Sequence, residues 1–347
     1  MHPRGRYLAA GLLAVAASGG TTTMAPFESG GSDRVGAHVV TAFADPRIDE
    51  SSGLVVRGGS LFTVNDSGDG AHVYAVDLRS GETRTVTTYD DEEPVDVEAL
   101  AAGRGRALWV GDIGDNQRSR GTVAVHRLVP REGAVRAARF ELTYPDGPHD
   151  AETLLVHPRT GRLLVVTKLP VLGGTVYRAP RTLREDDVHR LERVARVPGT
   201  LTDGAFLPDG RHVVLRSYGA AWVYTYPGFE QVAEVALPEQ EQGEGAAVVG
   251  GRRRADPARL YLSSEGERSQ VLAMDLPVPG PGTPRSPSRS PETVQDPDGD
   301  AADEPGDAPR DRTGLGRPPG YLLAAVLGSA LVGLWVRASR RRGRRRR

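Results

Sequence analysis

Short runs of apolar and β-branched residues recur along residues 37–277, and turn-forming residues separate them. In the first stretch, four such runs follow one another, and Gly-, Asp- and Ser-rich segments lie between them. Runs of this length between turn residues are typical of β-strands. Helical periodicity is weak except over residues 183–193, which we interpret as a short helix or an elaborated loop. The pattern predicts an all-β fold.

The four-run succession repeats along the chain, and a fifth copy stops one strand short. Units that begin at Ser51, Asp96, Asp150, Thr202 and Gln242 are spaced by 45, 54, 52 and 40 residues. Four strands in about 40–50 residues are typical of one β-propeller blade. We therefore predict about five four-stranded blades, and the two long spacings leave room for a sixth. A pair of β-sandwiches is the alternative, but it does not explain the Asp, Gly and Glu residues shared by the unit starts.

The strand missing from the last unit has a candidate donor before the first unit. Residues 37–43 form another β-prone run. If this run pairs with the last blade, it closes the ring and removes a free sheet edge. We predict this closure for the propeller domain of residues 37–277.

Acidic and glycine-rich motifs recur at the start of the units and after their second strands. They are Ser51-Ser-Gly-Leu54 with Asn65-Asp-Ser-Gly-Asp69, Val97-Glu-Ala-Leu100 with Gly111-Asp-Ile-Gly-Asp-Asn116, His149-Asp-Ala-Glu152, Thr202-Asp-Gly-Ala-Phe206 and Gln242-Gly-Glu-Gly245. With these motifs, the chain resembles secreted and membrane-anchored actinobacterial β-propeller proteins of the WD40-like, gluconolactonase-like and phytase-like group. The resemblance implies the propeller fold. The group it points to has no established activity, so the resemblance implies none for this chain. The units lack the Trp-Asp ending of WD40 blades and the double glycine of kelch blades.

Equivalent positions of the blades meet at one rim of the central channel, so the motifs predict a ring of carboxylates there. Alignment of the units places Gly53, Glu98, Glu152, Gly204 and Glu244 in one column. Close carboxylates repel one another unless a cation, a basic ligand or proton uptake compensates them. The candidate ligand-binding residues are Asp66, Asp69, Asp96, Asp115, Asn116, Asp150, Asp203, Glu265, Lys168 and Arg216.

Calcium is the cofactor that this ring suggests, because Ca²⁺ prefers oxygen ligands from several loops. The resemblance to phytase-like and lactonase-like propellers implies the same ion. The candidate metal ligands are Glu98, Asp112, Glu152 and Glu244. The competing interpretation is that these Asp and Gly residues form turns and satisfy backbone N–H groups at strand ends.

A catalytic set is incomplete in the sequence. Glu98, Glu152 and Glu244 are candidate general bases, and His149 is a candidate acid. Lys168 and Arg216 could hold an anionic substrate or neutralise the carboxylates. Sequence motifs of α/β-hydrolases, zincins, P-loop NTPases and Rossmann enzymes do not occur. We expect a binding module that uses its acidic rim, with a Ca²⁺-dependent lactonase-like or phosphoesterase-like hydrolase as the alternative.

The two ends of the chain predict export and anchoring. Residues 1–18 have the layout of a signal peptide, with 19–36 as a flexible segment after it. Residues 278–319 are rich in Pro, Ser and Asp and predict a disordered stalk. Residues 320–336 are uncharged and predict a transmembrane helix, although the run is short for a bilayer. The eight arginines of residues 337–347 predict a cytoplasmic tail by the positive-inside rule.

Composition adds three constraints to this interpretation. The net charge of −1 becomes −9 when the +8 of the tail is subtracted, so the body is acidic. The chain contains no cysteine, which excludes disulfides and thiolate metal sites. Aromatic residues make up 5% of the chain, which disfavours a stacking groove for nucleic acid. We expect the membrane and an extracellular protein or glycan as partners.

Overall fold

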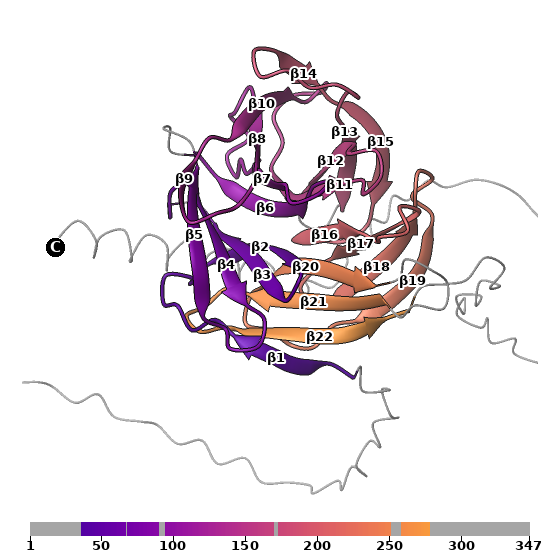
Figure 1. Cartoon of the computed structure of the whole chain (residues 1–347). Helices are drawn as coiled ribbons and strands as arrows, with labels where there is room; N and C mark the ends of the chain where they lie inside the picture. Colours follow the sequence, from indigo (N-terminus) through magenta and orange to yellow (C-terminus); the bar gives the residue numbers. More distant parts are fainter. Residues whose placement is uncertain (1–35, 67, 90–93, 170–172, 251–257, 278–347) are drawn as a thin grey trace, which may run out of the picture. The chain divides into compact units, whose positions relative to one another are not determined.

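The computed structural model describes residues 36–66, 68–89, 94–169, 173–250 and 258–277. These residues form an all-β propeller of five blades (Figure 1). The predicted signal peptide (1–18), stalk (278–319), transmembrane helix (320–336) and tail (337–347) lie outside the described residues, as does the segment 19–36 except for Gly36. No helix that could cross a bilayer occurs in the part of the chain that the structure describes.

The first three blades follow the predicted repeats closely. Blade 1 contains β2 (Ser51–Arg57), β3 (Ser60–Asn65), β4 (His72–Asp77) and β5 (Thr83–Tyr89). Blade 2 contains β6 (Val97–Ala102), β7 (Leu108–Asp112), β8 (Val123–Leu128) and β10 (Ala138–Thr143). Blade 3 contains β11 (Ala151–Val156), β12 (Leu163–Thr167), β13 (Gly174–Arg178) and β15 (Glu192–Val197).

The last two blades complete the ring. Blade 4 contains β16 (Asp203–Phe206), β17 (His212–Arg216), β18 (Ala220–Thr225) and β19 (Gln231–Ala236). Blade 5 contains β20 (Gly243–Gly250), β21 (Ala258–Ser264) and β22 (Gln270–Leu276), and β1 (His38–Ala42) is its fourth strand. Because β1 pairs antiparallel with β22, the predicted closure by the N-terminal strand is confirmed. The inner strands β2, β6, β11, β16 and β20 contact one another in a closed cycle.

Two short strands that the repeats did not predict extend neighbouring blades. The strand β9 (Gly133–Val135) pairs parallel with β5, and β14 (Val188–Arg190) pairs parallel with β10. Both come from connections of the following blade, so they link adjacent blades at the outer edge. The long second and third repeats therefore hold these strands and no sixth blade. The interpretation of residues 183–193 as a short helix is wrong, because this segment is an elaborated loop that contains β14.

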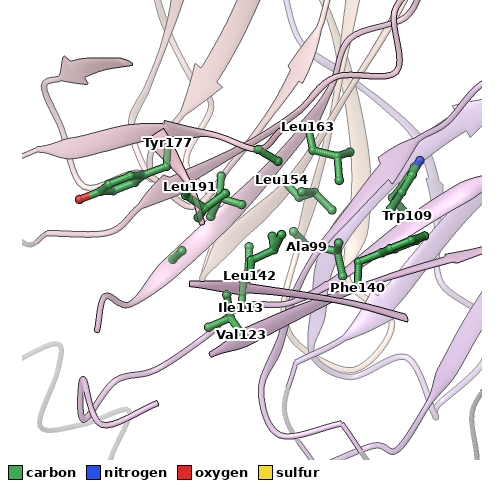
Figure 2. Packing of buried hydrophobic residues seen from close by; sticks show 14 of the residues in the cluster. Ala99, Trp109, Ile113, Val123, Phe140, Leu142, Leu154, Leu163, Tyr177 and Leu191 are labelled. Carbon is green, nitrogen blue, oxygen red and sulfur yellow. The ribbon is translucent and has the colours of Figure 1, made fainter. Parts of the chain in front are cut away.

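The hydrophobic core lies between the blades. Each sheet packs both of its faces, so successive residues of one strand point into two different interfaces. In β12, Leu163 and Val165 pack between blades 2 and 3, whereas Leu164 and Val166 pack between blades 3 and 4. Figure 2 shows the first of these interfaces, with Trp109 and Phe140 from blade 2 beside Leu154 and Leu163 from blade 3.

Closure by β1 has a measurable consequence. We expect a variant without residues 1–43 to melt on the order of 10 °C below a variant without residues 1–35, because β22 loses its partner strand. The freed edge should also promote self-association. Circular dichroism melting and size-exclusion chromatography of the two truncations test this, since the shorter truncation retains β1. Equal melting temperatures would contradict a closing role for β1.

Candidate functional site

Three buried glutamates occupy the same place in three blades, at a β-bulge near the start of the inner strand. In β6, Val97 pairs with Asp112 and Ala99 with Gly111, which leaves Glu98 between them. The register shifts in the same way around Glu152 in β11, and in β20 it shifts between Gly243 and Ala246, an interval that contains Glu244. A bulge turns its extra residue away from the regular alternation of the strand. The sequence pattern placed these glutamates in one column, and the structure places them at matching positions.

Blades 1 and 4 differ from this arrangement. In β2 the bulge contains Ser52, so Ser52 and not Gly53 is the counterpart of Glu98. The Ser52 hydroxyl donates a hydrogen bond to the Glu98 carbonyl at 2.8 Å. In β16 the ladder runs without a bulge, and Asp203 pairs directly with Arg216.

The three glutamates share one electrostatic environment. Each is at most 5% exposed. Burial raises the pKa of Glu98 well above its usual range, and the charges of Glu152 and Asp66 raise it further. Burial raises the pKa of Glu152 to about 8 and that of Glu244 to about 7. The charge of Glu152 acts on Glu98 and that of Glu244 acts on Glu152, so carboxyl groups from three blades influence one another electrostatically.

Lys168 neutralises part of this acidic centre. Its ammonium group donates a hydrogen bond to Glu152 Oε1 at 2.6 Å and lies 5.8 Å from the ring of Tyr218. Burial lowers the pKa of Lys168, but the carboxylates of Glu152 and Glu244 outweigh burial and hold it well above its usual value. Lys168 could hold an anionic substrate or neutralise the carboxylates, and its ion pair with Glu152 fits neutralisation.

Arg216 has a structural role at the same rim, where it links blade 4 to blade 5. Its side chain is completely buried, and it donates hydrogen bonds to the carbonyls of Gly245 (2.9 Å) and Ser263 (3.2 Å) and to Gln240 Oε1 (3.2 Å). Burial lowers its pKa to about 10, so it stays charged at neutral pH. A side chain at Gly243 would displace this guanidinium group, because a Cβ there would lie 2.1 Å from Arg216 Nη2.

Asp66, Asp96 and Glu98 form a second grouping at the rim. One carboxylate oxygen of each lies within 4.8 Å of the others. Gly114 makes room for them, because a Cβ there would lie 2.5 Å from Asp96 Oδ2 and 2.8 Å from Glu98 Cγ. Three convergent carboxylates are ligands of the type that Ca²⁺ prefers. This trio shares only Glu98 with the four metal ligands suggested by the sequence.

Several candidate residues instead hold the rim together. Asp112 accepts hydrogen bonds from the Asp96 N–H and from Arg120 Nη1, both at 2.9 Å. Two aspartates link neighbouring blades through backbone N–H groups: Asp150 accepts from Asp115 at 2.9 Å, and Asp203 accepts from Ala246 at 2.7 Å. Asp115 accepts hydrogen bonds from the N–H groups of Ser119 and Arg120. Asp69 accepts a hydrogen bond from the Tyr74 hydroxyl, and Glu265 accepts one from the Gln242 side-chain amide. Asn116 is exposed.

His149 lies apart from the glutamates. Its Nε2 atom is 3.0 Å from Asp146 Oδ1 and 2.9 Å from the Tyr177 hydroxyl, and its ring packs edge-on against Tyr144. No contact between His149 and the buried carboxylates occurs among the described residues. Sequence reasoning missed two neighbours of the site, Ser52 and Tyr218. A shift of the first repeat by one residue would have revealed Ser52.

The fold and these residues define a class of protein, a five-bladed β-propeller with a buried acidic rim.

No protein-family model and no curated protein matches the chain. Solved structures do match, among them the glutaminyl cyclase of Myxococcus xanthus, with a TM-score of 0.42 and 13% identity over 70% of this chain and 97% of that chain. Another is an exo-β-1,3-galactanase of Phanerochaete chrysosporium with bound β-1,3-galactotriose, with a TM-score of 0.45 and 11% identity over 70% of this chain and 64% of that chain.

Proposed function

We propose that this protein is a binding module that recognises a cationic group of an extracellular protein or glycan at its acidic rim. The observation that carries the proposal is the burial of Glu98, Glu152 and Glu244 at matching bulges of three blades. Buried carboxylates that repel one another destabilise a fold unless a cation compensates them or they take up protons, as their raised pKa values indicate. A cationic ligand would provide that compensation.

Two of the three glutamates at the rim lack a basic partner among the described residues and could pair with a cationic ligand. Lys168 pairs with Glu152, and Arg216 is occupied by carbonyl groups. Among the described residues, neither Glu98 nor Glu244 forms an ion pair, and Glu244 Oε2 is buried without a hydrogen-bond partner. A lysine, arginine or amino-sugar group could occupy this position, because ammonium and guanidinium groups supply the missing donors.

The proposal includes a location. The predicted signal peptide (1–18) would export the propeller, and the predicted transmembrane helix (320–336) would hold it at the outer face of the cell membrane. The stalk of residues 278–319 would separate it from the bilayer, and the tail of residues 337–347 would remain in the cytoplasm. A receptor-like binding module is consistent with such an anchored position.

A Ca²⁺-dependent lactonase-like or phosphoesterase-like hydrolase is the second candidate, and the trio of Asp66, Asp96 and Glu98 favours it. These three carboxylates would hold the ion, which would polarise a carbonyl or phosphoryl oxygen. Glu244 would then serve as a general base or acid, because burial raises its pKa to about 7, close to physiological pH.

Titration calorimetry of the full chain with an oligolysine peptide tests the binding proposal. We expect saturable binding that Glu98→Gln weakens at least about tenfold, because a charge-assisted interaction is lost. The exposed Glu239 provides a matched control, so Glu239→Gln should bind as the native protein does. Equal affinity of the native protein and the Glu98→Gln variant would refute a role for the rim.

Calcium distinguishes the second candidate. An ion that binds the native state must raise the melting temperature. If Ca²⁺ raises the melting temperature of the native protein but not that of Asp96→Asn, the hydrolase is favoured. If calcium leaves the melting temperature unchanged while oligolysine binds, the binding module is supported without a metal.

A further inference from the structure

A group of arginines lies at the end of the strands away from the glutamates. Glu152 is near the start of β11 and His157 follows its end, so about 16 Å of extended chain separates the two. At this far end, a cavity of about 280 Å³ opens between blades 3 and 4. It is lined by His157, Thr160, Arg162, Arg178, Arg181 and Tyr226. We call it the arginine cleft.

The positive charges of the arginine cleft are incompletely compensated. Arg178 pairs with Glu192 at 2.7 Å, and no other ion pair of Arg162, Arg178 or Arg181 occurs among the described residues. The Nε atoms of Arg162 and Arg178 are buried without hydrogen-bond partners. Burial lowers the pKa of Arg162, and the charges of Arg178 and Arg181 lower it further. Three arginines thus line one cavity, and among the described residues only Arg178 has an acidic partner.

The wall that His157 forms is neutral and is held by hydrogen bonds and ring contacts. His157 Nδ1 accepts hydrogen bonds from the backbone N–H groups of Arg159 and Thr160, both at 3.2 Å. Burial lowers the pKa of His157, which keeps the ring neutral. The ring also packs against Phe206 at 5.1 Å and Tyr226 at 5.3 Å between centroids. The arginines therefore lie beside an aromatic surface formed by His157 and Tyr226.

We propose that the arginine cleft binds the phosphate group of a small ligand. Guanidinium groups match phosphate because each can donate two parallel hydrogen bonds to its oxygens. A dianion would compensate the repulsion among Arg162, Arg178 and Arg181 and would accept hydrogen bonds from the guanidinium groups that line the cavity. The cavity is slightly smaller than the roughly 300–1,000 Å³ of typical ligand sites, so a compact phosphate ester fits best. The ester could be free in solution or belong to a lipid headgroup.

A solvated arginine patch is the alternative, because arginine supplies all but one of the 44 basic residues of the chain. Two features distinguish the cleft from such a patch. Solvated guanidinium groups have water as a partner, whereas the Nε atoms of Arg162 and Arg178 are buried. The cleft also has a defined cavity with neutral aromatic walls on one side.

Titration calorimetry of the full chain with inorganic phosphate and with glycerol 3-phosphate tests the proposal. We expect saturable binding of one phosphate group, weakened at least about tenfold by Arg162→Gln and by Arg181→Gln. Arg79→Gln, on an exposed turn of blade 1, should not change the affinity. Because Arg181 is exposed, its replacement should leave folding intact even if the partly buried Arg162 cannot be replaced.

Vesicles distinguish the two sources of the phosphate group. Co-sedimentation with phosphatidic acid vesicles that Arg181→Gln weakens, but no heat with glycerol 3-phosphate, would assign the cleft to a lipid headgroup, because the variant keeps the predicted membrane helix and the basic tail. Heat with glycerol 3-phosphate would assign it to a free ester. Absence of binding to all three probes, or equal binding by the native protein and both cleft variants, would overturn the proposal. Glu98→Gln should not affect phosphate binding, so this result is independent of the function proposed for the rim.

Discussion

Replacement of Arg216 by methionine should destabilise the propeller by about 3–5 kcal/mol, because it removes one member of a buried polar network. Methionine fills a similar volume but leaves the carbonyls of Gly245 and Ser263 without these donors. For a domain of this size, such a loss corresponds to a melting temperature lower by on the order of 10 °C. Arg79→Met, on the surface of blade 1, is the matched control and should change stability little.

A double-mutant cycle separates this network from packing alone. Gly243→Ala should be strongly destabilising in the native background, since the new Cβ would lie 2.1 Å from Arg216 Nη2. In the Arg216→Met background, the flexible methionine can move, so the same change should be milder. Additive effects of the two substitutions would contradict the contact, and unchanged melting of Arg216→Met would contradict the structural role of the guanidinium.

The blades were predictable because each of their strands is marked by a short stretch of sequence. Each β-strand is a short run of apolar residues between turn residues, and both faces of each sheet are buried, so the runs stand out from their surroundings. The same logic located β1, whose sequence is β-prone although its partner β22 is more than 200 residues away. The strands β9 and β14 were not predictable, because three residues carry little pattern and their partners belong to neighbouring blades.

The site was predictable in residue type but not in the roles of its members. Glu98, Glu152 and Glu244 share one column because the repeat carries them to the same bulge. Asp112 and Asp150 carry the same chemical group, yet they accept backbone N–H groups, which depends on how adjacent blades meet. The arginine cleft was invisible in the sequence, since the turn after β11, the end of β13 and the segment after β18 come together only in the folded chain.

Both ends of the propeller therefore hold charge that the fold compensates incompletely. At the rim the uncompensated groups are carboxylates, and in the arginine cleft they are guanidinium groups. Natural proteins tolerate such destabilising arrangements mainly where activity or binding requires them. The stability of variants is therefore informative about function. If replacing a residue raises the melting temperature and lowers the affinity for a ligand, that residue belongs to a binding site.

Glu244→Gln tests this trade-off directly and should stabilise the protein at alkaline pH. Burial raises the pKa of Glu244 from the model-peptide value of 4.5 to about 7 in the native state. Between these two values the unfolded chain has lost the proton and the native state retains it, so stability falls as pH rises through this window. The fall amounts to at most about 3–4 kcal/mol, since each pKa unit corresponds to about 1.4 kcal/mol.

Glutamine has no charge to bury, so the variant should lose this part of the pH dependence. We expect equal melting temperatures of the native protein and the variant near pH 4, and a higher melting temperature of the variant at pH 8. Glu239→Gln, on the surface, is the control and should follow the native profile. If the glutamate serves a cationic ligand, the same Glu244→Gln variant must bind oligolysine more weakly while it melts at a higher temperature. A variant that is both more stable and equally good at binding would show that Glu244 is no part of the site.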